Sequence, residues 1–340
     1  MASNNNATIV NDRNTNLDTL RGMACVLLIF YHVVGLDPAS GLRLPLDSHY
    51  RAFNDILAYI RMPLFTILSG VVYAMRPVTE GAGRDFAQGK LKRLLIPFIF
   101  VSLIFAVAQK LAPETNSDLT WTQIPLVLIW PYAHMWFIAG LLLVFALVSA
   151  LDHWHALDKP LHMFALFALA CVLFKWRHGA VGVFSWNRAL YLLPFFVAGI
   201  MSKRFGWKWG LSCALLAALS PGWELTLGVG FGVALLVVMP AISLLGRLGV
   251  YSYSIYLFHV FGTASSRIIW ETLGVSDVPF LLLSGTLAGV IVPIAIHLTL
   301  ERVPYISRAF LGVRHKATAV EVAPTLGLPK PIGIILPRVE

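Results

Sequence analysis

Long apolar segments follow one another from about residue 17 to residue 300, and they constrain the fold more than any other feature. A helix of about 20 apolar residues is long enough to cross the hydrocarbon core of a bilayer. Hydrophobic residues make up 58% of the chain and charged residues only 13%, whereas soluble domains carry about 25% charged residues. The sequence therefore predicts an all-α, polytopic membrane helix bundle.

About ten membrane-spanning helices are expected from the apolar segments. The boundaries are least defined within 203–247, where one segment is short and Ser220-Pro221-Gly222 signals a tight turn. The stretch from Trp121 to Tyr132 is apolar but too short to span, which predicts an interfacial or re-entrant piece. The expected spans are 17–36, 53–75, 93–111, 134–151, 161–175, 186–202, 208–220, 224–242, 248–270 and 279–300.

The basic residues indicate how the bundle is oriented. Most of the 26 Lys and Arg residues fall in loops on the side of the N terminus, including the basic loop 76–92. Cytoplasmic loops of membrane proteins carry this excess, so both termini are predicted to be cytoplasmic. The net charge of +9 is explained in the same way and does not indicate nucleic-acid binding. The first span is too long for a signal peptide and lacks a small-residue cleavage site, so we expect it to be retained.

The first span carries three ionisable residues, Asp18, Arg21 and His32. Eleven positions separate Arg21 from His32, which is about three helical turns plus roughly 20°, and roughly 16 Å along the axis. Both side chains therefore share one face, and Asp18 shares it through its i,i+3 spacing from Arg21. Ionisable groups inside a membrane are functional by default. The alternative is an Arg that reaches the headgroups and a His bonded to a neighbouring helix.

The second span contains Arg61, followed by Pro63 and the pair Ser69-Gly70. Arg61 either extends to the outer interface or faces the polar interior at the depth of His32. A proline inside the span kinks the helix and frees backbone groups that line a cavity. Ser69-Gly70 favours a close approach of two helices.

Further candidates lie at the ends of other spans. Lys90 and Arg93 form a basic cluster with Lys92 that either anchors the cytoplasmic interface or binds phosphate groups of a nucleotide-like ligand. His134 begins the fourth span at its outer boundary, where a solvated histidine is the simplest interpretation. Tyr256 and His259 share one face of the ninth span. His259 there suits an interhelical hydrogen bond as well as catalysis.

Glu301 closes the tenth span, where a surface ion pair is the simplest interpretation. His153, His155 and His162 lack the spacing of metal ligands, and no pair of cysteines has that of a zinc site, so no bound metal is expected. The residues alone indicate a bundle with a polar interior that opens to the cytoplasm. That suits a membrane enzyme or a transporter equally.

Six segments of the chain resemble, in order, motifs of the acyltransferase 3 family of integral membrane O-acyltransferases. The resemblance covers about 17–305, and RMPLFTILSG with its short flanks is closer to the branch that acetylates sugars of capsules and exopolysaccharides. Many members carry a C-terminal esterase-like domain, which the basic, Pro/Gly-rich tail 306–340 is too short to contain. We therefore expect a stand-alone membrane domain 17–305 after a polar tail 1–16. The segments are LDTLRG with FYH, RMPLFTILSG, KLKRLLIP, HMWFIAGLL, LGVYSYSIYLFH and LERVP.

The resemblance implies transfer of an acyl group, usually acetyl, from cytoplasmic acyl-CoA to a sugar hydroxyl of an envelope glycan or its lipid-linked precursor. A bacterial inner membrane protein without a tightly bound cofactor is expected. By motif, Arg21 holds the donor and His32 is the base, or alternatively the carrier of the acyl group. Asp18 would orient Arg21, and Arg61, Ser69 and Tyr256 are candidate oxyanion donors. The alternative function is a transporter or flippase that uses the polar face as a path.

Overall fold

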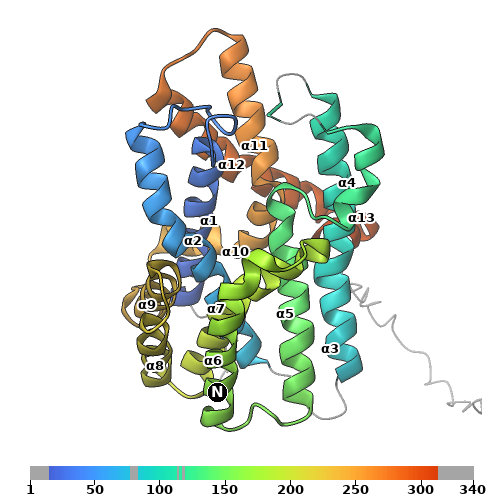
Figure 1. Ribbon diagram of the computed structural model, residues 1–340. Coiled ribbons are helices and arrows are strands. Elements are labelled where there is room, and N and C mark those ends of the chain that lie inside the picture. The colour runs from blue at the N-terminus through green and yellow to red at the C-terminus, as the bar shows by residue number, and fades with distance from the viewer. Residues whose placement is uncertain (1–14, 77–82, 113–114, 117–118, 313–340) are drawn as a thin grey trace, which may run out of the picture.

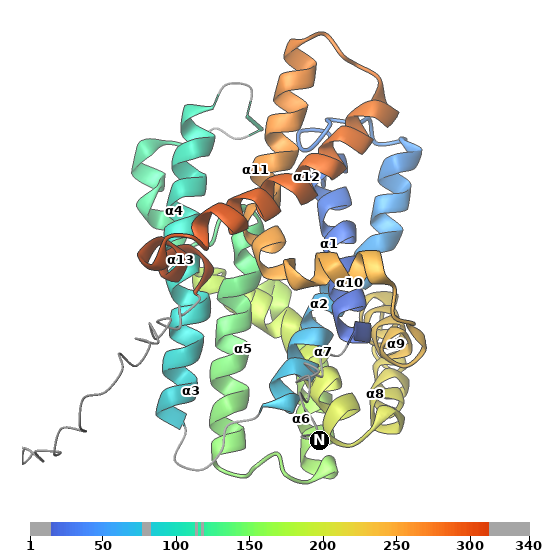
Figure 2. The same ribbon diagram turned by 180° about the vertical axis from the view of Figure 1, so that it is seen from behind.

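The computed structural model describes residues 15–76, 83–112, 115–116 and 119–312. Of the predicted tails 1–16 and 306–340, only residues 15–16 and 306–312 lie within these ranges. The described chain forms an elongated bundle of helices (Figure 1), and Figure 2 shows its other face. The helices in chain order are α1 (Thr15–Val34), α2 (His49–Met75), α3 (Gly83–Lys90), α4 (Ile96–Leu111), α5 (Trp136–His153), α6 (Pro160–Trp176), α7 (Trp186–Arg204), α8 (Trp207–Ala218), α9 (Trp223–Val238), α10 (Ser243–Val250), α11 (Ser252–Thr272), α12 (Val278–Leu300) and α13 (Pro304–Leu311).

The predicted membrane helix bundle is confirmed. Seven helical segments within the described ranges are long and apolar enough to cross a membrane, or eight if the bent pair α9–α10 is one span. Each of the ten predicted spans contains a helix, but fewer than ten meet that standard. The helix α8 has only 12 residues, and the predicted span 224–242 ends early because α10 turns 115° away from α9.

The bundle has two ends, which are named here the Arg21 end and the distal end. The Arg21 end is where α1 begins and where α2, α5 and α7 end. The distal end carries the connections 35–48 and 273–277, at the top of Figure 1. The segment Trp121–Tyr132 runs at the distal end as the short 3-10 helices η2 (Trp121–Gln123) and η3 (Pro125–Leu128). As predicted, this segment is not a separate membrane span.

Helix α1 lies at the centre of the bundle and packs against α2, α10, α11 and α12. The close packing of α10 across α1 depends on two glycines. A Cβ atom on Gly22 would overlap the backbone carbonyl of Leu245, and one on Gly249 would overlap that of Asp18. Small residues permit this backbone approach between membrane helices. The first half of α1 is thereby covered by a helix that crosses it (Figure 2).

Helices α2 and α7 approach each other in the same way. A Cβ on Gly70 would overlap the carbonyl of Phe196, and one on Gly199 would overlap the carbonyl of Ile67. This reciprocal contact confirms the close helix approach predicted at Ser69-Gly70. Because α2 is held here, its first half is fixed against α1, with which it also packs.

The predicted loop 76–92 is wrong in its second half, because α3 continues through a π-helical turn, η1 (Leu91–Leu95), into α4. Pro97 has no backbone N–H and cannot donate back to the preceding turn. The carbonyl of Arg93 accepts a hydrogen bond from the hydroxyl of Tyr253 on α11 instead, at 2.5 Å. Pro97 thus leaves the carbonyl of Arg93 available to Tyr253, and this hydrogen bond joins α11 to the segment.

A buried cluster joins three helices at the Arg21 end. Asp152 near the end of α5 accepts hydrogen bonds from both terminal nitrogens of Arg204 on α7, at 2.8 and 2.9 Å. The hydroxyl of Tyr73 on α2 donates to the same carboxylate at 2.8 Å. Asp152 therefore belongs to the helix core and not to a surface loop. These residues are called the Asp152 cluster below.

Candidate active site

The three ionisable residues of α1 lie along the helix as its periodicity predicts. Nη1 of Arg21 donates to Oδ1 of Asp18 at 2.9 Å, so the predicted i,i+3 pair is present. The carboxylate is buried, whereas the Arg21 side chain is 30% exposed and remains reachable from solvent. His32 lies near the other end of α1 and is partly buried. A charged pair and an imidazole therefore share one helix at different depths.

Two further histidines surround His32. His134 comes from the short 3-10 helix η4 (Ala133–Met135), and His259 comes from the middle of α11. The ring centroid of His32 lies 4.7 Å from that of His259 and 6.0 Å from that of His134, and the last two are 5.0 Å apart. His134 is buried and not solvated at a membrane boundary, because η4 folds back toward α11. These residues are called the histidine cluster.

The hydrogen bonds of His134 and His259 indicate their tautomers. Nδ1 of His259 lies 2.9 Å from the carbonyl oxygens of Ile255 and Tyr256, and Nε2 of His134 lies 3.1 Å from that of Leu257. A carbonyl only accepts, so each of these ring nitrogens carries the proton in the neutral imidazole. The other nitrogens, Nε2 of His259 and Nδ1 of His134, are buried acceptors without a partner among the described residues. Each of these nitrogens carries a lone pair, and both rings lie close to the His32 ring.

Tyr256 fixes the position of His134. Its hydroxyl donates to the backbone carbonyl of His134, and its ring centroid lies 5.7 Å from the His134 ring. The phenol is buried and occupied by this contact. Tyr256 therefore lies beside the histidine cluster, where its hydroxyl supports η4 instead of offering its O–H to a ligand.

Arg61 is buried on α2 and does not extend to the interface. Its guanidinium carbon lies 3.8 Å from the ring centroid of Tyr31, and Nη1 donates to Asn54 at 3.2 Å. The Tyr31 ring in turn contacts the His32 ring at 4.7 Å between centroids. The Nε–H of Arg61 has no partner among the described residues. A buried cation with an unused donor is therefore placed near the histidine cluster.

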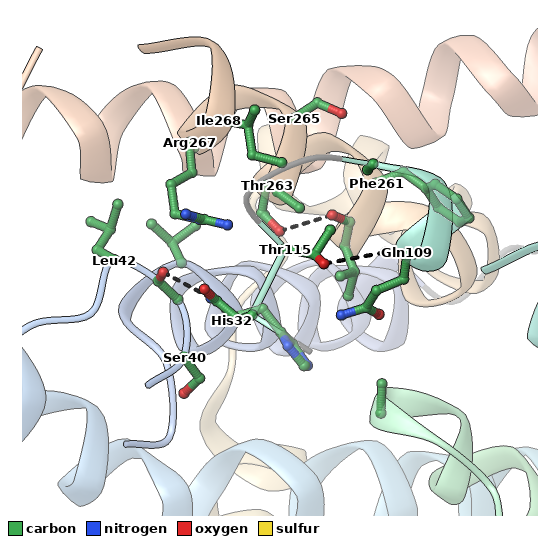
Figure 3. A pocket seen from close by; sticks show the side chains of 18 of the residues that line it. His32, Ser40, Leu42, Gln109, Thr115, Phe261, Thr263, Ser265, Arg267 and Ile268 are labelled. Atoms are coloured by element: carbon green, nitrogen blue, oxygen red, sulfur yellow. Dashed lines mark hydrogen bonds between the residues drawn. The ribbon is translucent and has the colours of Figure 1, made fainter. Parts of the chain in front are cut away.

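A cavity of about 310 Å³ lies at the distal end and is lined by His32. Its walls come from residues 40–42, the second half of α4 and residues 260–268 of α11. Figure 3 shows His32 on one side of this space, with Gln109 and Arg267 on other sides. This cavity lies at the end opposite to Arg21, where the connection 35–48 and α11 surround it. The interior that opens to the cytoplasm stays a prediction.

Four predicted site residues are not brought to His32. The hydroxyl of Ser69 donates to the carbonyl of Phe65 on its own helix at 2.9 Å. Glu301 is exposed, and its carboxylate lies 3.6 Å from Nε2 of His297. The ammonium of Lys90 lies 3.5 Å from the ring centroid of Phe145, so it packs between α3 and α5. Arg93 is exposed within the π-helical turn η1.

No group of three or more His, Cys, Asp or Glu residues in the described ranges is arranged to hold a metal ion. The histidine cluster is included in this statement. The three imidazoles of this cluster are suited to proton transfer and hydrogen bonding.

Arg267 and Gln109 line the cavity but were not among the residues predicted from the sequence. Arg267 is an ionisable residue inside the predicted span 248–270, and the argument that selected Arg21 also applies to it. Gln109 carries no comparable signal, because an amide near the end of an apolar segment resembles an ordinary interfacial residue.

These features define a polytopic membrane protein with a buried histidine cluster between a charged helix end and a cavity. Residues 14–298 match a protein-family model, Acyl_transf_3, described as an acyltransferase domain. The chain therefore belongs to this acyltransferase family, and it is an integral membrane protein. No curated protein and no solved structure matches the chain.

Proposed function

We propose that the protein transfers an acyl group, in the simplest case acetyl, from cytoplasmic acyl-CoA to a hydroxyl of an envelope or exported glycan or its lipid-linked precursor. A bacterial inner membrane is the setting in which such an acceptor is made. The position of His32 carries the proposal. This imidazole lies on the helix that bears Arg21 at one end, and it also lines the cavity at the other end.

The donor approaches from the Arg21 end, which the positive-inside rule assigns to the cytoplasm. CoA is an anion, and guanidinium groups bind phosphates through paired hydrogen bonds. Asp18 holds one terminal nitrogen of Arg21 and thereby orients it. Arg93, which is exposed, is a second candidate for phosphate contact. The pantetheine arm then has roughly 16 Å to cover along α1 before it reaches His32.

The acceptor approaches from the distal end through the cavity. His32 takes the proton of the acceptor hydroxyl as its oxygen attacks the thioester carbon. A new ester C–O bond forms, the C–S bond breaks, and the CoA thiolate leaves and is protonated. The unpartnered lone pairs on His259 and His134 accept a hydrogen bond from the imidazolium that His32 becomes. They thus stabilise the form that appears during the reaction.

Arg61 is the best candidate for stabilising the developing oxyanion. The three candidates from the sequence were Arg61, Ser69 and Tyr256. The hydroxyls of Ser69 and Tyr256 are both occupied by backbone carbonyls. The Nε–H of Arg61 is buried and without a partner in the described chain. A preorganised donor of this kind is worth about 10²–10³ in rate.

The test is release of CoA thiol by the purified protein in nanodiscs, with acetyl-CoA and an oligosaccharide acceptor. We expect thiol release only when both substrates are present, and a loss of about 10²–10⁴-fold in His32→Ala. His162→Ala, which alters an exposed histidine at the start of α6, is the matched control and keeps the wild-type rate. A His32→Ala protein that acylates at the wild-type rate would overturn the assignment. A transporter would move substrate without releasing thiol.

A further inference from the structure

The arginines of the described chain differ in what compensates their charge. Several of them form an ion pair with a carboxylate. Arg61 is 7% exposed, and within the described ranges it forms no such pair. The exposed carboxylate of Asp55, on the same helix, acts on Arg61 only at longer range. The paired arginines are Arg21, Arg177, Arg204 and Arg267.

Backbone carbonyls do not compensate Arg61 either. Arg51 on the same helix is also buried, but its three nitrogens donate to carbonyls of the residues just before α2. Arg61 instead donates from Nη1 to Asn54 at 3.2 Å, and its Nε–H has no partner among the described residues. A buried cation of this kind needs another stabilising contact, because it has lost its water.

The ring of Tyr31 on α1 supplies that contact. The guanidinium carbon of Arg61 lies over this ring, 3.8 Å from its centroid. The face of an aromatic ring attracts a cation, and the attraction is stronger where the cation is withdrawn from water. A carboxylate would instead pair with two N–H groups at once. The ring therefore stabilises the charge of Arg61 while the Nε–H stays free.

Tyr31 also contacts the imidazole of His32. The two ring centroids are 4.7 Å apart, and the ring planes are inclined by 76°. Arg61 is close enough to His32 for its charge to act on the imidazole. One side chain thus contacts both groups to which the proposed reaction assigns a role, the base and the oxyanion donor.

We propose that Tyr31 is a positioning residue of the acyl transfer, whose ring holds the Arg61 guanidinium beside His32 with the Nε–H free for the developing oxyanion. The inference rests on the proposed function for the roles of Arg61 and His32. A carboxylate in place of the ring would also hold Arg61, but it would occupy the N–H donors and cancel part of the charge that the oxyanion needs.

The test replaces Tyr31 by Phe and by phenylalanines with one, two and three ring fluorines, in the full-length protein in nanodiscs. Fluorine weakens the negative ring face and changes the ring shape little. With acetyl-CoA and the oligosaccharide acceptor used above, Tyr31→Phe should stay within about twofold of the wild-type kcat. The kcat should then fall stepwise, to about tenfold below Tyr31→Phe with three fluorines. The KM for acetyl-CoA should stay unchanged, because the oxyanion exists only in the transition state.

Two further variants separate positioning from packing. Tyr31→Leu removes the attraction and should lower both the Tm and kcat. Tyr31→Glu gives Arg61 a carboxylate and should recover the Tm, but its kcat should stay about as low as that of Tyr31→Leu. The matched control is the same fluorinated series at Tyr305, which is 82% exposed on α13 and should change neither quantity. If the leucine variant does not fold, the fluorinated series still decides.

A kcat that does not depend on the number of fluorines would overturn the inference, and so would a wild-type kcat in Tyr31→Glu. A series in which only the Tm falls would make Tyr31 a purely structural residue. The proposed function is judged separately by thiol release from the wild-type protein. Release by the wild type with a flat fluorinated series removes the inference alone, whereas no release by the wild type removes the function and the role of Tyr31 with it.

Discussion

The Asp152 cluster and the histidine cluster are both buried and polar, but they differ in how completely their atoms are paired. In the Asp152 cluster, the carboxylate accepts from two nitrogens of Arg204 and from the hydroxyl of Tyr73. In the histidine cluster, one ring nitrogen of His134 and one of His259 have no partner among the described residues. Both clusters join helices that are distant in sequence.

This difference separates a structural role from a chemical one. Buried polar atoms are almost always hydrogen-bonded, so an exception requires an explanation. A fully paired cluster stabilises one arrangement of the helices. An incompletely paired cluster beside a cavity has acceptors left for a substrate or for a proton that moves during the reaction. Substitutions in the two clusters should therefore have opposite effects on stability and on activity.

Asp152→Asn should destabilise the protein and leave its chemistry intact. The substitution removes the charge that compensates Arg204, whose side chain is 18% exposed, and breaking a largely buried pair in this way costs up to about 3 kcal/mol. We expect an apparent Tm several degrees lower in detergent, measured by thermal unfolding. The rate of acyl transfer per folded molecule should change by less than about twofold.

Tyr73→Phe is the control within the same cluster. It removes a single hydrogen bond and should cost only about 1 kcal/mol. If Asp152→Asn abolished the activity of the folded protein while its Tm stayed unchanged, the Asp152 cluster would have a chemical role and not a structural one.

The histidine cluster should respond in the opposite manner, with lower activity and little change in Tm. Gln places its terminal oxygen near the Nε2 position of a histidine, and Asn places its oxygen near the Nδ1 position. The unpartnered acceptor is Nε2 in His259 and Nδ1 in His134. We therefore expect His259→Gln and His134→Asn to retain most activity, because each keeps the acceptor beside His32.

The reciprocal variants, His259→Asn and His134→Gln, should lose about 10–100-fold in kcat, somewhat less than removal of a general base. The measurement is thiol release at saturating substrates, with thermal unfolding as the check on folding. Equal losses in all four variants would show that the rings only fill space, and the acceptor argument would then fail.

The fold was largely predictable because the bilayer requires long apolar helices and the sequence contains them. The errors arose where the hydrophobic pattern of the sequence does not indicate where a helix bends or continues. No charged residues mark the sharp turn between α9 and α10, so the sequence does not signal it. The helix continues through Leu91–Leu95, but the basic residues there are typical of a loop. Contacts such as Gly22 against Leu245 depend on pairs of helices that a single sequence does not identify.

The geometry of the candidate site was predictable along α1 and less so between helices. Periodicity placed Asp18, Arg21 and His32 on one helix, and the ion pair between the first two is present. His134 and His259 were candidates for separate reasons. Their meeting at His32 depends on η4 folding back toward α11, which no local pattern in the sequence indicates.

Arg21→Gln tests the other end of the proposed path. It should raise the KM for acyl-CoA about tenfold and leave kcat nearly unchanged, because a partly exposed charged hydrogen bond contributes less than a buried one. Lys208→Gln, an exposed cation at the start of α8, is the control and should change neither constant. An unchanged KM in Arg21→Gln would mean that this residue only pairs with Asp18.

Ser69→Ala should have the smallest effect, within about twofold in kcat and KM. Its hydroxyl is occupied by the carbonyl of Phe65, and a bond of this local type adds little to a helix. Ser69 lies eight residues from Arg61, roughly 12 Å along α2, which is too far for a shared oxyanion contact. The neighbouring Gly70→Ala should be far more damaging, because its methyl group would overlap the carbonyl of Phe196 and separate α2 from α7. A large loss of kcat in a stable Ser69→Ala protein would instead return this hydroxyl to the reaction, and Arg61 would no longer be the preferred oxyanion donor.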